Sequence, residues 1–144
     1  MLREAPHGYI AYSINDEATA DKITRAIINE FDTQAIYIET RRLALNPSDS
    51  LIEDMKNAIK TCNFFLILVS RNSSKSKWVD IAFKYALRNE LKSNRPKIIP
   101  ILIDKCPLPQ NLTHYKFYDL TDNIDEELAE TCKEIKEKIM SVIT

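Results

Sequence analysis

A hydroxyl-rich loop spans residues 70–76, and the only tryptophan of the chain, Trp78, follows it closely. The whole stretch, residues 70–83, reads SRNSSKSKWVDIAF. Serine hydroxyls can hydrogen-bond a polar ligand, and an indole ring can stack on a planar ligand or form the wall of a cleft. An indole in this place can equally fix the loop to the core. The sequence leaves both roles of Trp78 open.

The elements on either side of this loop would hold it in place. Before it, FFLILVS at residues 64–70 is apolar up to its last residue, which is typical of a parallel strand covered on both faces. After it, apolar residues recur at helical spacing from residue 76 to residue 91. Further strands are predicted at residues 9–13, 35–38, 97–103 and 114–120, and further helices at residues 17–31, 51–62 and 124–143.

Capping residues and one proline refine this prediction. Asp16 and Ser50 are expected to cap the helices that follow them. Pro100 predicts a bulge or a gap in pairing within its strand. Strands and helices alternate throughout, which indicates an open α/β sandwich with helices on both faces of a parallel sheet. In such sheets ligands bind beyond the carboxyl ends of the strands, and these ends fall at residues 13–17, 39–50, 70–78 and 104–109.

Composition excludes several classes of function. A chain of 144 residues predicts a single domain over residues 1–144, and a net charge of −1 argues against a nucleic-acid surface. The single glycine, Gly8, excludes the glycine-rich phosphate loops of dinucleotide folds and P-loop enzymes. No apolar run predicts a membrane span or a signal peptide. The three cysteines are far apart, and no cluster with histidine is visible, so we expect reduced thiols, a cytoplasmic location and no metal site.

Three segments, followed by KIIPILID, give the chain a resemblance to TIR domains, the Toll/interleukin-1 receptor family. They are YIAYSINDE, then IYIETRRLALNPSDSLIEDMKNAI, then CNFFLILVSRNSSKSKWV. The matching residues are Tyr12, Ser13 and Asp16 in the first, Leu45, Pro47 and Ser50 in the second, and Ser70, Ser76, Trp78 and Val79 in the third. Ser48 stands where the family usually has glycine. The resemblance implies a flavodoxin-like three-layer α/β sandwich with a five-stranded parallel sheet in the order 2-1-3-4-5.

The resemblance also implies a function. Many bacterial and plant TIR domains cleave NAD+ at the nicotinamide–ribose bond, and stand-alone bacterial ones (Thoeris-like) make an ADP-ribose-type messenger for a separate effector in antiphage defence. NAD would be the substrate, and no cofactor or metal is expected. The positions that the resemblance assigns to substrate binding are Tyr12, Ser13, Glu39, Arg41, Ser74 and Trp78. Arg41 can equally be a solvated loop charge. Other TIR domains act as adaptors through association with one another.

One residue departs from the enzymatic pattern. The NAD-cleaving members resemble one another in carrying a glutamate four residues after the tryptophan, and this chain has Ala82 there. A carboxylate at that position would stabilise the cationic ribose of the transition state, and a methyl group cannot. Three interpretations stay open: a substitution introduced into an enzyme, a natural inactive domain that works by assembly, and a displaced carboxylate such as Asp80. With Ala82 the chain is predicted to be inactive.

Overall fold

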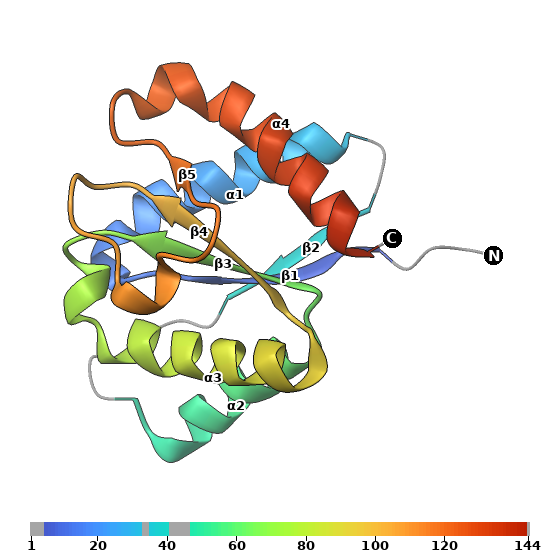
Figure 1. The fold of residues 1–144 in the computed structure, drawn as a ribbon, viewed down its shortest axis with the longest axis vertical. Coiled ribbons are helices and arrows are strands. Elements are labelled where there is room, and N and C mark those ends of the chain that lie inside the picture. The colour runs from blue at the N-terminus through green and yellow to red at the C-terminus, as the bar shows by residue number, and fades with distance from the viewer. Residues whose placement is uncertain (1–4, 33–34, 41–46, 144) are drawn as a thin grey trace.

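The computed structural model describes residues 5–32, 35–40 and 47–143 (Figure 1). Five parallel strands form one sheet in the order β2-β1-β3-β4-β5, which confirms the predicted fold class and strand order. The strands are β1 (His7–Ala11), β2 (Tyr37–Glu39), β3 (Phe64–Val69), β4 (Lys97–Leu102) and β5 (Tyr118–Asp119). The helices are α1 (Glu17–Phe31), α2 (Asp49–Lys60), α3 (Lys77–Ser93) and α4 (Ile124–Ile143).

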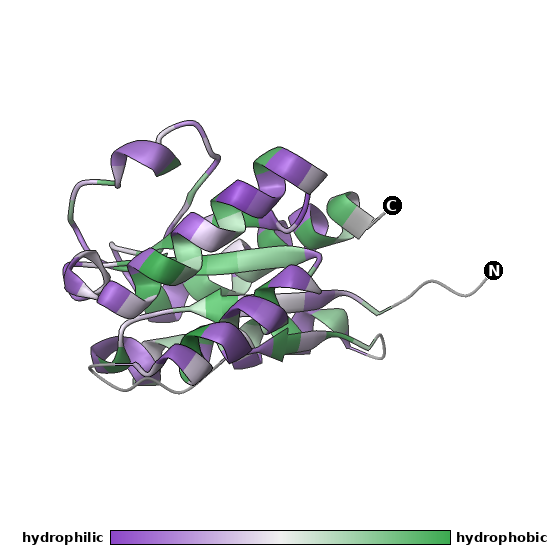
Figure 2. Cartoon of the chain, turned by 90° about the horizontal axis from the view of Figure 1, so that it is seen from below, coloured by the Kyte–Doolittle hydropathy of each residue, from purple (hydrophilic) through white to green (hydrophobic). Residues whose placement is uncertain are grey.

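The helices cover the sheet as two layers. Helices α1 and α4 pack on one face, and α2 and α3 pack on the other (Figure 1). The central strands are largely hydrophobic, whereas the helices carry hydrophilic stretches (Figure 2). Every residue of β3 is buried, because β3 lies between two strands and under helices on both faces. The sheet therefore separates an α1–α4 core from an α2–α3 core.

Two expected helix caps differ from the structure. Helix α2 begins at Asp49, and Ser48 is its cap, because the Ser48 Oγ accepts a hydrogen bond from the Leu51 N–H at 3.3 Å. Ser50 lies inside the helix, so its predicted capping role is wrong. Asp16 does occupy the position before α1, but its side chain makes no bond to the helix. Both of its carboxylate oxygens bind the loop after β3 instead.

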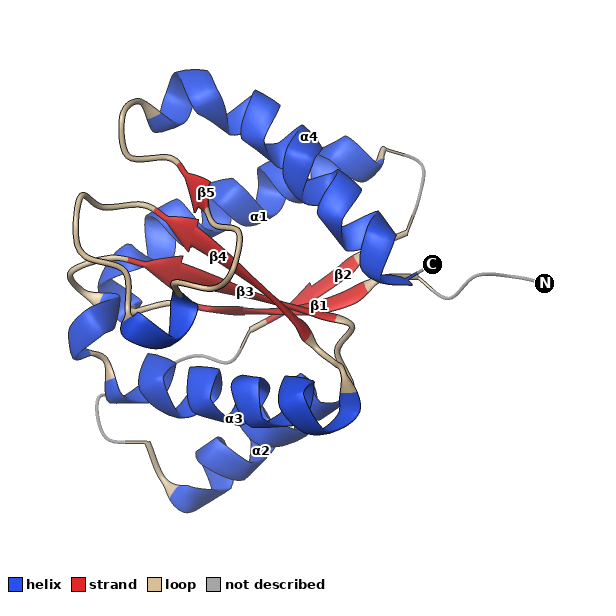
Figure 3. Ribbon diagram, viewed as in Figure 1, coloured by secondary structure: helices blue, strands red, loops and turns tan. Residues whose placement is uncertain are grey.

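The predicted bulge at Pro100 is also wrong. Pro100 pairs in register with Ile67, between two regular pairs. Figure 3 shows β4 as one uninterrupted strand beside β3. The N–H groups of Lys97 and Ile103 donate towards the β3 side. Backbone groups of successive residues in a strand point to alternate sides, and Pro100 is three residues from each of these two, so its nitrogen faces the β5 side. Strand β5 pairs only from Ile101 onward, and the missing donor therefore interrupts no ladder bond.

Candidate functional site

A buried polar network joins two loops at the C-terminal rim, the edge of the sheet where the strands end. The Ser70 Oγ donates to one oxygen of Asp16 at 2.6 Å, and the Asn72 Nδ2 donates to the other oxygen at 3.0 Å. Asp16 is 9% exposed and Ser70 only 1%. The network ties the loop after β1 to the loop after β3. Sequence reasoning matched Asp16 and Ser70 to family motifs, but it did not pair them.

The serine hydroxyl groups of the 70–76 loop also form hydrogen bonds with backbone groups of the loop and of the start of α3. The N–H of Ser70 donates to the Ser73 Oγ at 2.8 Å, and the N–H of Ser73 donates to the Ser70 Oγ at 2.9 Å. The Ser74 Oγ donates to the Arg71 carbonyl at 2.7 Å. The Ser76 Oγ caps α3 by accepting from the Val79 N–H at 3.2 Å. The serines therefore shape the turn that leads into α3.

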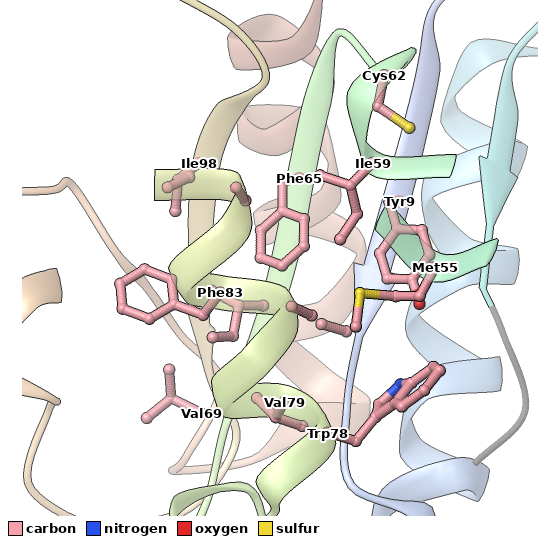
Figure 4. Close-up of a cluster of buried hydrophobic side chains, with 14 of the residues drawn as sticks. Tyr9, Met55, Ile59, Cys62, Phe65, Val69, Trp78, Val79, Phe83 and Ile98 are labelled. Carbon is pink, nitrogen blue, oxygen red and sulfur yellow. The ribbon is translucent and has the colours of Figure 1, made fainter. Parts of the chain in front are cut away.

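Trp78 and Ala82 lie inside the α2–α3 core. Trp78 is 3% exposed and Ala82 is 0% exposed. The indole lies beside Met55 at one end of this core (Figure 4). Trp78 therefore packs into this core, as expected of a side chain that fixes the loop, and its predicted part in ligand binding stays a prediction.

Two pockets open near the same rim, and neither is lined by Trp78 or Ala82 in the described part of the chain. One, of about 590 Å³, lies between α1 and the ends of β1 and β2 and includes Tyr12 and Thr40. The other, of about 600 Å³, lies between the start of α3 and residues 106–111 and includes Ser74. Tyr12 and Ser74 thus line different pockets.

Two neighbouring candidate residues, Tyr12 and Ser13, have different surroundings, and Tyr12 is the one that lines the first pocket. Side chains alternate along a strand, so Tyr12 packs with the α1–α4 core, on the face of the sheet away from Trp78. Ser13 is 4% exposed, and its Oγ accepts a hydrogen bond from the Asn15 N–H at 3.3 Å. Ser13 therefore shapes the turn into α1.

The second pocket holds charged groups over an apolar floor. Asp80 forms an ion pair with Lys84 at 3.0 Å on the exposed side of α3, so its carboxylate faces away from the buried position 82. Burial and the Asp104 carboxylate raise the pKa of the Cys106 thiol, although Arg71 acts in the opposite direction. At neutral pH the pocket therefore presents a protonated thiol.

Glu39 points away from the C-terminal rim. It pairs with Tyr9 across the strands, but its carboxylate reaches the His7 Nε2 at 3.2 Å, at the beginning of β1. The structure therefore does not bring Glu39 together with Trp78 or Ser13. Arg41, the remaining predicted binding residue, lies outside the described residues.

Among the described helices, none is both long and apolar enough to cross a membrane.

Comparison with known proteins agrees with this architecture. The sequence model of the TIR domain family matches residues 9–135. A search of curated proteins gave no match. Among solved structures, the TIR domain of the Toll-related receptor TRR-2 from Hydra magnipapillata superposes with a TM-score of 0.68 at 19% identity, covering 92% of this chain and 97% of that one.

Two further solved structures share the fold. The TIR domains of the activated Roq1 resistosome, which recognises the pathogen effector XopQ, superpose with a TM-score of 0.66 at 13% identity, covering 94% of this chain and 99% of that one. A prokaryotic SEFIR domain gives a TM-score of 0.64 at 16% identity, covering 94% and 99%. At these identities the likeness concerns the fold alone. The family match over residues 9–135 carries the assignment, and the chain belongs to the TIR domain family.

Proposed function

We propose that this chain acts by associating with other TIR domains and does not itself cleave NAD+. The observation that carries this proposal is the methyl group of Ala82, which is fully buried in the α2–α3 core. Cleavage of a glycosidic bond needs a carboxylate against the developing ribose cation. Asp80 does not replace it, because its carboxylate pairs with Lys84 on the outer side of α3.

Association is tested on the full chain by sedimentation velocity over a range of concentrations. We place the contact at the start of α2, where Asp49 and Leu51 are exposed. A double variant, Asp49→Lys with Leu51→Asp, reverses a charge and removes an apolar contact. We expect it to weaken self-association at least tenfold, because each lost or mismatched contact at an interface centre costs about 1–2 kcal/mol.

The matched control changes a charge on the opposite layer of the molecule. Lys138 lies on the exposed side of α4, and Lys138→Glu should leave self-association unchanged. A chain that stays monomeric at every concentration, alone and with a second TIR domain, contradicts the proposal.

A second candidate function is NAD+ cleavage to an ADP-ribose-type signalling nucleotide for a separate effector in antiphage immunity. Its support is the hydroxyl-rich loop, with Trp78 and position 82 at the family spacing, from which only the carboxylate is missing. Tyr12, Ser13, Ser74 and Arg41 would then contact the dinucleotide, in an arrangement other than the one described here.

Ala82→Glu distinguishes the two candidates, with Ala82→Gln as its uncharged control of equal size. Each variant is first checked for a folded far-ultraviolet spectrum, because a carboxylate in this core is costly to desolvate. Each is then incubated with NAD+, and free nicotinamide is measured by chromatography at concentrations where the chain associates. We expect no release from any form. Release by Ala82→Glu alone supports the second candidate, and release by the unaltered chain contradicts the first.

A further inference from the structure

Three side chains with metal-binding atoms meet at the N-terminal edge of the sheet, where the strands begin. A ring nitrogen of His7, a carboxylate oxygen of Glu39 and the Cys62 Sγ lie within 4.8 Å of one another. His7 begins β1, Glu39 ends β2, and Cys62 stands between α2 and β3. The three residues are far apart in the sequence, so their spacing gave no sign of the cluster.

Backbone pairing holds the three side chains in place. The His7 N–H donates to the Asn63 Oδ1 at 2.9 Å, and the Asn63 N–H donates back to the His7 carbonyl at 2.6 Å. These two bonds fix Cys62 next to the start of β1. Parallel pairing of β1 with β2 sets Tyr9 opposite Glu39, and the Glu39 carboxylate reaches back to the His7 Nε2 at 3.2 Å.

We infer that His7, Glu39 and Cys62 form a binding site for a divalent transition metal, with Zn²⁺ as the ion that the donors suit best. Imidazole nitrogen, thiolate sulfur and carboxylate oxygen are the three donor types that zinc takes in proteins. With zinc–ligand bonds of about 2.0–2.3 Å, ligand atoms in a tetrahedron stand roughly 3.3–3.8 Å apart. The His7–Glu39 separation of 3.2 Å is already close to this value, and the sulfur, within 4.8 Å of both partners, needs to approach by at most about 1 Å.

Access and proton balance are consistent with binding. The side chains of His7 and Glu39 are 31% and 35% exposed, and Cys62 is buried beneath them, so the ion enters from solvent past the outer pair. Coordination needs the thiolate, so the Cys62 thiol releases one proton to solvent and gives up its 3.0 Å bond to the Ala58 carbonyl. Three protein ligands leave a fourth position, which a water molecule fills.

This site is distinct from the C-terminal rim. In Figure 4 Cys62 and Trp78 lie at opposite ends of the α2–α3 core. The cluster therefore does not depend on whether the rim binds a nucleotide. What a bound ion would do is join the starts of β1 and β3 to the edge strand β2.

The test is a titration of the chelator-treated full chain with Zn²⁺ and with Co²⁺, whose colour reports its ligands. We expect one equivalent to bind, and the cobalt form to show a near-ultraviolet thiolate-to-metal charge-transfer band. A bound ion should also raise the midpoint of thermal unfolding in proportion to the logarithm of its concentration. If the unaltered chain binds no equivalent of either ion, or binds Co²⁺ without the thiolate band, the inference is overturned.

Variants locate the site. His7→Asn, Glu39→Gln and Cys62→Ala should each weaken binding at least tenfold, and Cys62→Ala should abolish the thiolate band. His7 and Glu39 are half-exposed, and the backbone bonds of His7 do not need its ring, so the first two variants are expected to fold. The controls are His114→Asn, at the other histidine, which is exposed, and Cys106→Ser, at a half-exposed cysteine. Loss of binding in the controls, with retention in His7→Asn, would also overturn the inference.

Discussion

At the scale of single residues, Ser70 links the loop after β1 to the loop after β3. Its hydroxyl donates to the buried Asp16 carboxylate at 2.6 Å and accepts from the Ser73 N–H at 2.9 Å. Ser70→Ala removes both contacts and leaves a buried carboxylate oxygen short of a donor. We expect a loss of about 1–3 kcal/mol in the free energy of unfolding, measured by urea denaturation.

The matched control for this prediction is Ser74→Ala. Ser74 is exposed, and its hydroxyl donates to the Arg71 carbonyl in the same loop. Its loss should change stability by no more than about 0.5 kcal/mol. Equal effects of the two substitutions would mean that the Asp16 contact does not stabilise the fold.

The sequence located single residues better than it located their partners. Ser70, Ser76 and Trp78 stand where the strand, loop and helix pattern placed them. The pairing of Ser70 with Asp16 was not predictable, because it depends on how far β1 and β3 each extend towards the C-terminal rim. For the same reason Glu39 was assigned to the C-terminal rim, although its carboxylate turns back towards His7. Side-chain direction at a strand end is decided by three-dimensional neighbours rather than by spacing.

At the scale of elements, helix positions followed from hydrophobic periodicity, and the ends of elements did not. Strand β5 was expected over residues 114–120, but only Tyr118–Asp119 pair with β4. The residues before them are held from outside the sheet, because the Tyr115 hydroxyl bonds the Glu90 carboxylate of α3. A side-chain bond to a distant helix leaves no periodic signal in the sequence. It therefore could not be anticipated.

The contact between α1 and α4 contains a titratable group. Cys132 of α4 is fully buried, and burial, aided by the Glu30 carboxylate of α1, raises the pKa of its thiol from 9.0 to about 12. Below the pKa of the thiol in the unfolded chain, Cys132 is protonated in both the folded and the unfolded state. Its contribution to the free energy of unfolding is then fully present. Above about pH 9 the unfolded chain loses the proton first, and stability falls by up to about 1.4 kcal/mol per pH unit until the folded pKa is reached.

Urea denaturation from about pH 7.5 to about pH 10.5 measures this decline. Cys132→Ala should make the slope above about pH 9 shallower. The slope is compared rather than absolute stability, because the substitution also leaves a small cavity. Cys106→Ala is the control, since that thiol is only half-buried and should account for less of the slope. An unchanged slope in Cys132→Ala would contradict the assignment.

At the scale of the whole molecule, the two cores share one sheet, and a substitution at Gly8 can show whether they unfold together. Gly8 pairs with Phe64, and a Cβ on Gly8 would come within 2.6 Å of the Phe64 Cδ2 in the α1–α4 core. Trp78 lies in the α2–α3 core, so its fluorescence reports on the opposite layer. Because β1 and β3 belong to both cores, we expect the layers to unfold together.

Gly8→Ala tests this coupling. The added methyl group should lower the free energy of unfolding by about 1–3 kcal/mol. The midpoint of thermal unfolding should fall by roughly 2–4 °C for each kcal/mol lost. Trp78 fluorescence and far-ultraviolet circular dichroism should report the same lowered midpoint. Adding Phe64→Leu should return part of the loss, which a double-mutant cycle measures as a coupling between the two positions. If the Trp78 midpoint stays in place while the dichroism midpoint falls, the α2–α3 layer unfolds independently, and the shared sheet does not make the domain cooperative.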